Sequence, residues 1–219
     1  MEATTAPRGG LRADAANGGP HRQARETTSR LPEAIADPAP LGLAAFALTT
    51  FVLSFFNAGW VSDAGEPIVF GLAFAYGGLA QILAGMWEFK NNNTFGATAF
   101  TSFGAFWLSL FAFEQFFAEG VPAAAVGDAV GLYLIAWGIF TAYMWIASFR
   151  VSVAVNIVFL LLAPTFILLG IGDAAGNETI THLGGILGVA TALAAWYASF
   201  AGVTNKTFGR VVLPVRPLK

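Results

Sequence analysis

The chain has 219 residues, of which 56% are hydrophobic and 11% charged, whereas soluble domains average about 45–50% apolar and about 25% charged residues. A formal net charge of −2 leaves no basic excess for phosphate contacts, which excludes a typical nucleic-acid-binding function. The sequence contains no cysteine, which excludes thiol catalysis, cysteine metal sites and disulfides. Composition therefore predicts a protein whose main partner is the lipid bilayer.

The first 36 residues differ from the rest of the chain. They carry five Arg against four acidic residues and show no periodic apolar face. They also lack the short continuous apolar run that a secretory signal peptide requires. We predict that residues 1–36 form a disordered cytoplasmic tail.

Six apolar stretches follow, each about 20 residues long, which is enough to cross the ~30 Å hydrocarbon core as a helix. They lie at residues 40–61, 67–88, 96–118, 129–148, 151–172 and 180–203. Their residues do not alternate between apolar and polar, which argues against a membrane β-barrel. The pattern predicts an all-α integral membrane protein: a six-transmembrane-helix bundle over residues 37–205, followed by a cytoplasmic tail at 206–219.

The charges predict the topology of this bundle. Every Lys and Arg lies in the two tails or in the second and fourth connections, which contain Lys90 and Arg150. The first, third and fifth connections contain acidic residues and no basic ones. Under the positive-inside rule, both termini are therefore cytoplasmic. We expect a multi-pass protein of the plasma membrane, which in a bacterium is the inner membrane.

Few ionisable residues lie within the apolar stretches, and they form no catalytic set. Glu88 ends the second helix near the cytoplasm, Glu114 lies near the outer end of the third, where exposure is its simplest explanation, and His182 opens the sixth. The spacing of His21 and His182 matches no metal motif. We therefore predict no enzyme activity, no catalytic residue, no metal and no cofactor.

Uncharged polar residues do recur on single faces of the first three helices. Such residues can serve close helix packing, because small and hydroxyl side chains let helices approach. The amides of Asn57 and Gln81 instead favour a path for a small solute, and an uncharged path suits such a solute better than a metal cation. The residues predicted to line this path are Thr49, Thr50, Asn57, Tyr76, Gln81, Thr98, Thr101 and Ser102.

Several motifs carry a family resemblance. The segment Asp37-Pro38-Ala39-Pro40-Leu41-Gly42-Leu43 resembles the Asn-Pro-Ala-Pro-Leu-Gly-Leu signature of the acetate uptake transporter family, which includes bacterial succinate-acetate permeases. Further matches fall in the family's order, among them Tyr76-Gly77-Gly78-Leu79-Ala80-Gln81, Asn93-Thr94-Phe95-Gly96 and Phe208-Gly209-Arg210. The resemblance covers about residues 37–214.

The resemblance implies a homo-hexamer with a path for acetate and related small carboxylates, succinate among them, through each subunit. It also implies a hydrophobic constriction formed by Phe46, Phe103 and Leu162. Phe103 stands where the family commonly has Tyr, which predicts a drier constriction with one hydrogen-bond donor fewer. Asp37 replaces the signature Asn, and both side chains can accept hydrogen bonds from helix N-terminal amides.

Several interpretations of function stay open at this point. Carboxylates could pass as anions through a channel or together with a proton. The same polar faces could serve neutral solutes such as water or ammonia. The N-terminal tail also leaves room for a membrane scaffold or sensor.

Overall fold

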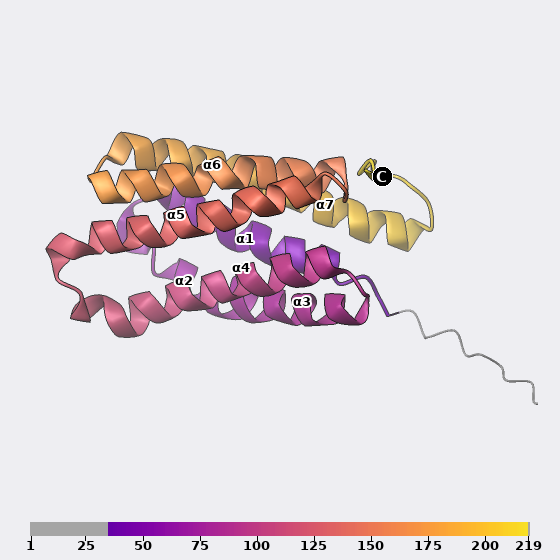
Figure 1. The fold of residues 1–219 in the computed structure, drawn as a ribbon, viewed down its shortest axis with the longest axis horizontal. Coiled ribbons are helices and arrows are strands. Elements are labelled where there is room, and N and C mark those ends of the chain that lie inside the picture. The colour runs from indigo at the N-terminus through magenta and orange to yellow at the C-terminus, as the bar shows by residue number, and fades with distance from the viewer. Residues whose placement is uncertain (1–34, 219) are drawn as a thin grey trace, which may run out of the picture. The chain divides into compact units, whose positions relative to one another are not determined.

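A computed structural model describes residues 35–218 of the chain, so the predicted N-terminal tail lies almost entirely outside the described residues. Six helical spans in this part are long and apolar enough to cross a membrane. The all-α six-helix fold is thereby confirmed (Figure 1). The first, fourth, fifth and sixth spans are α1 (Ala39–Asn57), α5 (Ala123–Ser148), α6 (Val153–Ala175) and α7 (Glu178–Phe208).

The second and third spans are not regular α-helices throughout. The second consists of α2 (Ile68–Phe74), a π-helix η2 (Ala75–Ala80) and α3 (Gln81–Lys90). The third consists of α4 (Thr94–Ala112), a π-helix η3 (Phe113–Phe117) and a short 3-10 helix η4 (Ala118–Gly120). A further 3-10 turn, η1 (Asp63–Gly65), lies between α1 and α2.

Local sequence explains where the helices begin and end. The side chains of Asn93, Ser152 and Asn177 accept hydrogen bonds from backbone N–H groups in the first turns of α4, α6 and α7, which is the usual role of an N-cap residue. Gly176 and Gly209 end α6 and α7 in the left-handed conformation that glycine adopts without strain. The fourth span starts at Ala123, six residues before its predicted start, because its alanine-rich first turn is a good helix former.

Small residues bring the helices together. α1 packs against α7 and α3, α4 packs against α3, and α6 lies between α5 and α7 (Figure 1). A Cβ atom added to Gly185 would lie 2.3 Å from the backbone nitrogen of Ala58, so at this point the backbones of α1 and α7 nearly touch. Such close approach is typical of helix packing in membranes.

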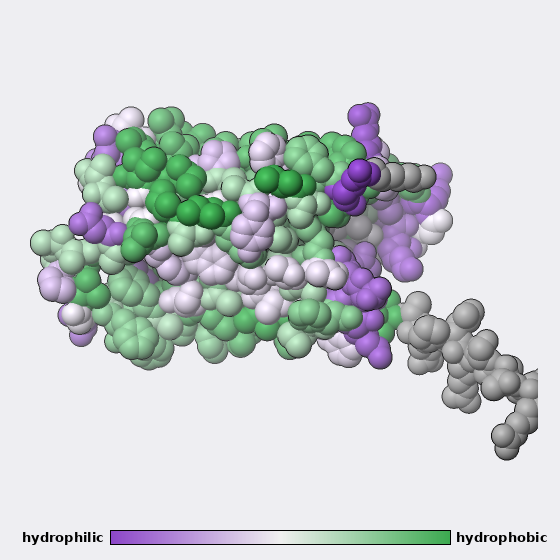
Figure 2. Space-filling model, viewed as in Figure 1, coloured by the Kyte–Doolittle hydropathy of each residue, from purple (hydrophilic) through white to green (hydrophobic). Residues whose placement is uncertain are grey.

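The surface of the bundle is apolar between two polar ends. Figure 2 shows hydrophobic residues along the helices and hydrophilic residues gathered towards the ends. We call the end that carries the connections 58–67, 121–122 and 176–177 the acidic end, and the opposite end the basic end. In the most apolar stretch of 18 residues in α5, only 11% of the residues are buried, so this helix presents most of its side chains outward.

The described part of the C-terminal segment folds back on the bundle. α7 continues to Phe208, and the Asn205 side chain then bonds the backbone of Val212 and Leu213. Further on, the backbone N–H of Val153 at the start of α6 donates to the Arg216 carbonyl at 2.9 Å. Residues 209–218 therefore connect the end of α7 to the start of α6.

Candidate functional site

Two cavities lie one after the other along the inside of the bundle. The smaller, of about 70 Å³, lies toward the basic end, and we call it the basic-side chamber. The larger, of about 220 Å³, lies toward the acidic end and is called the acidic-side chamber. The polar residues in their walls are Gln81, Glu88 and Asn93 in the first, and Thr50, Ser54, Asn57, Glu66, Glu114, Thr165 and Asp173 in the second.

The three residues of the predicted constriction lie in the chamber walls. Phe46 and Leu162 belong to the walls of both chambers, and Phe103 belongs to the wall of the basic-side chamber. All three are buried, with exposures of 3–4%. The ring centroids of Phe46 and Phe103 are 5.7 Å apart. Phe46, Phe103 and Leu162, from α1, α4 and α6, therefore all lie in the wall of the basic-side chamber, and we call these three residues the neck.

Packing around the neck restrains its side chains. Phe103 contacts the rings of Trp137, Phe140 and Phe166 as well as Phe46, at centroid distances of 5.4–6.3 Å. Aromatic pairs at these separations stabilise each other beyond the area they bury. Pro164 lies inside α6 two positions after Leu162 and removes one intrahelical N–H donor there.

Some of the predicted path residues line the chambers. Thr50 and Asn57 lie in the wall of the acidic-side chamber, and Gln81 lies in the wall of the basic-side chamber. Thr98 lines a separate hollow at the basic end, beside Thr94 and Arg150. The predicted path is therefore polar on both sides of the neck.

The other predicted path residues lie outside both chamber walls. The Thr49 hydroxyl donates to the Ala45 carbonyl at 2.9 Å, and Thr49 packs against Gly77. Thr101 packs against Gly85 in the same manner. Tyr76 and Ser102 also belong to neither wall. At Thr49 and Thr101 the structure supports the helix-packing interpretation of the polar faces.

The signature segment anchors the start of α1. Asp37 Oδ1 accepts a hydrogen bond from the Ala39 N–H at 3.0 Å. The Ser199 hydroxyl of α7 donates to the Pro40 carbonyl at 2.6 Å. A Cβ atom on Gly42 would lie 2.6 Å from the Phe100 ring, so only glycine fits there.

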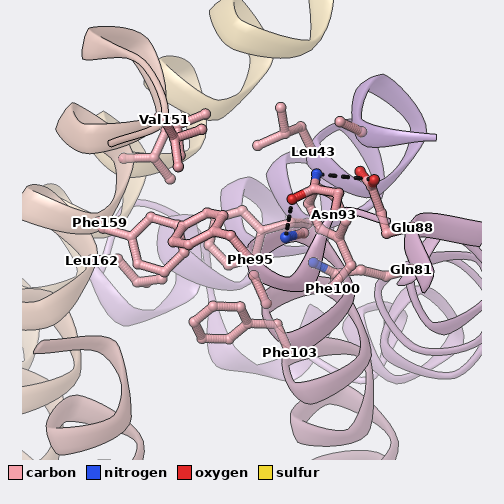
Figure 3. A pocket seen from close by; sticks show the side chains of 16 residues that line it. Leu43, Gln81, Glu88, Asn93, Phe95, Phe100, Phe103, Val151, Phe159 and Leu162 are labelled. Atoms are coloured by element: carbon pink, nitrogen blue, oxygen red, sulfur yellow. Dashed lines mark hydrogen bonds between the residues drawn. The ribbon is translucent and has the colours of Figure 1, made fainter. Parts of the chain in front are cut away.

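The burial of Glu88 was not expected from the sequence. Its side chain is 1% exposed and lines the basic-side chamber (Figure 3). The Asn93 side-chain amide donates to Glu88 Oε2 at 3.0 Å, while Oε1 is enclosed without a hydrogen-bond partner among the described residues. The turn between α3 and α4 covers this carboxyl group. The position of Glu88 at a helix end in the sequence did not indicate this burial.

The acidic-side chamber opens toward the acidic end through carboxylates. Glu66, Glu114 and Asp173 lie in its wall, and Glu66 and Asp173 also line the wider hollow at the surface. The pKa of Glu66 is raised above its ordinary value of 4.5, mainly because burial disfavours the charge and also because Glu114, Asp63 and Asp173 repel it. The predicted exposure of Glu114 agrees with the structure.

Comparisons with known proteins agree with this architecture. The chain is 41% identical over 83% of its length to the Succinate-acetate/proton symporter SatP of Escherichia coli, and it covers 95% of that protein. It is 44% identical to Ammonia transport outward protein 2 of Saccharomyces cerevisiae, over 78% of the chain but 62% of the yeast protein.

A solved structure is similar as well. The structure of the bacterial acetate channel SatP superposes with a TM-score of 0.78 at 41% identity, and the match covers 83% of this chain and 99% of that one. The family model described as the GPR1/FUN34/yaaH family matches residues 22–219. These matches confirm the family resemblance of the sequence motifs, and this multi-pass membrane protein therefore belongs to the GPR1/FUN34/yaaH family.

Proposed function

We propose that this protein passes acetate and related small carboxylates across the membrane, through the two chambers and the neck between them. The observation that carries the proposal is the position of Phe46 and Leu162 in the walls of both chambers. The names of the relatives, a succinate-acetate/proton symporter and an acetate channel, support the choice of substrate. Membership of this family also supports a transport role rather than an enzymatic one.

The neck controls passage through the cost of removing water from a charged group. A carboxylate with a pKa of about 4.3 is almost fully ionised at neutral pH, and a desolvated anion is costly in an apolar environment. Apolar constrictions gate by dewetting. Thr50 on one side of the neck and Gln81 on the other offer hydrogen bonds that replace part of the water shell.

The charge on the substrate decides between two modes of passage. The neck itself has no ionisable side chain, because it consists of Phe46, Phe103 and Leu162. A relay of protons between side chains therefore has no group to use at this point. We propose that the carboxylate passes either as an anion or together with its own proton, as the free acid.

Orientation and assembly complete the proposal. The acidic end faces outward and the basic end faces the cytoplasm, in accordance with the positive-inside rule, in the plasma membrane or the bacterial inner membrane. The outward-facing apolar side chains of α5, such as Leu132, Ile139 and Ile146, contact lipid or further copies of the chain. A homo-hexamer, as the family resemblance implies, would bring several such surfaces together.

The test is an electrical measurement on the purified protein in a planar bilayer, with a tenfold acetate gradient, equal pH on both sides and an otherwise impermeant electrolyte. A current that reverses near the acetate equilibrium potential would show anion conduction. Labelled acetate entering proteoliposomes without current would show electroneutral passage with a proton. Absence of acetate passage by both methods would refute the proposed function.

A second candidate function is the passage of ammonia. The observation that favours it is the similarity to a yeast protein whose name describes outward ammonia transport. The same polar groups on both sides of the neck could bind a neutral solute. In this case acetate would neither permeate the proteoliposomes nor compete with ammonia.

A further inference from the structure

Three carboxylates from separate parts of the chain converge on the acidic-side chamber. Glu66 precedes α2, Glu114 lies in η3 and Asp173 lies near the end of α6, and all three line its wall. Among the residues that the structure describes, no Lys, Arg or His belongs to this wall. A carboxylate substrate that crosses the chamber therefore meets charges of its own sign.

The same chamber also contains enclosed polar groups that lack a partner. Thr50 is 6% exposed and Trp107 is 2% exposed, and both belong to the chamber wall. The Thr50 hydroxyl oxygen and the Trp107 indole nitrogen have no hydrogen-bond partner among the described residues. Buried polar groups normally have one. A hydroxyl and an indole N–H are both donors, so the missing partner is an acceptor such as a single carboxyl group.

The three carboxylates do not form a metal site. Among residues 35–218, no three His, Cys, Asp or Glu side chains are close enough to hold a metal ion together. Asp63 and Glu178 line the adjoining surface hollow together with Glu66 and Asp173 and add negative charge at the chamber mouth, where His182 also lies. The chamber therefore combines donors at its inner wall with a negative field at its mouth.

We propose that the acidic-side chamber selects monocarboxylic acids over dicarboxylates. This inference rests on the proposed function and specifies its substrate class. Glu66, Glu114 and Asp173 repel a second negative charge, while Thr50 and Trp107 bind the single carboxyl group of a substrate such as acetate. A succinate dianion carries one more charge into the same field. Its passage is disfavoured by a factor of roughly two for each carboxylate about 10 Å away in water at low salt, where screening is weak.

The experiment compares initial uptake of labelled acetate and labelled succinate by proteoliposomes at neutral pH. The double variant Glu66→Gln with Glu114→Gln removes two of the three charges. The matched control is Glu119→Gln with Asp128→Asn, which removes two exposed charges at the same end that line neither chamber. The ratio of the two uptake rates does not depend on the direction of insertion, because every substrate molecule crosses the chamber.

We expect the double variant to lower the acetate-to-succinate ratio roughly fourfold at low salt, and less at high salt because counter-ions screen the charges. The control should leave the ratio unchanged. Asp173→Asn alone, which keeps the proposal testable if the double variant does not fold, should lower the ratio about twofold. A ratio that stays constant in these variants, or that changes equally in the control, would overturn the inference. Absence of acetate uptake in the unaltered protein would instead refute the proposed function.

Discussion

Replacing Phe46 with Ala tests the neck most directly. The Phe46 side chain is 4% exposed, lies against Phe103 and belongs to the walls of both chambers. Without its ring, the chambers of about 70 and 220 Å³ join. Water can then stay with the passing carboxylate. One retained hydrogen bond to a charged group contributes about 1.5–3 kcal/mol, which corresponds to a rate increase of about one to two orders of magnitude.

The assay is acetate flux or current per protein molecule in liposomes, with Phe100→Ala as the matched control. Phe100 is also buried, at 8%, but it lines the basic-side chamber only, and its ring lies against Gly42. Both variants lose a buried ring, which destabilises a protein by roughly 3–5 kcal/mol, so both are compared at equal folded amounts. Only Phe46→Ala should open the neck. If neither Phe46→Ala nor Leu162→Ala changed acetate flux, the assignment of the neck would be wrong.

Other variants test the neck, the packing and the charge. Phe103→Tyr restores the hydroxyl common in the family and should raise acetate flux severalfold in the same assay; an unchanged or lower flux would contradict a role for this group. Gly185→Ala should lower the thermal midpoint in detergent, because the added Cβ would lie 2.3 Å from the Ala58 nitrogen. The control Gly71→Ala should leave the midpoint unchanged or raise it, because no atom lies within 4 Å of the added Cβ. Equal effects of the two variants would refute the packing argument. The raised pKa of Glu66 means that the folded state binds more protons than the unfolded state, so stability falls as pH rises from 4.5 through the raised value. Glu66→Gln should therefore raise the thermal midpoint at neutral pH and not at acid pH. An effect of the variant that does not depend on pH would show that ionisation of Glu66 is not the reason for it.

The membrane spans were predictable because the bilayer imposes a simple rule on sequence. A helix that crosses it needs about 20 apolar residues, and runs such as 151–172 satisfy this requirement without any knowledge of their neighbours. The helix ends were also readable in part, since Asn93 and Asn177 have the side chains that cap helices. The neck residues came from the family resemblance and not from periodicity.

The chambers could not be predicted in the same way, because they depend on which helices touch. Thr49 and Thr50 are adjacent and equally polar, but Thr49 packs on Gly77 while Thr50 lines a chamber. Glu88 has a helix-end position that suggests exposure, and its burial follows from the turn that places Asn93 over it. Contacts between distant segments decide these outcomes, and a single sequence does not contain them explicitly.

The π-helix η2 affects how the second span tolerates the deletion of a residue. An α-helix advances 100° per residue, at 3.6 residues per turn, and a π-helical turn accommodates an additional residue. Deleting one residue within Ala75–Ala80 would therefore restore a regular α-helix and leave α2, with the turn that carries Glu66, in nearly the same orientation relative to α3. The same deletion in a regular part of the span would rotate the residues beyond it by about 100°. The π-helix is thus the part of the second span where the loss of one residue disturbs the acidic end least.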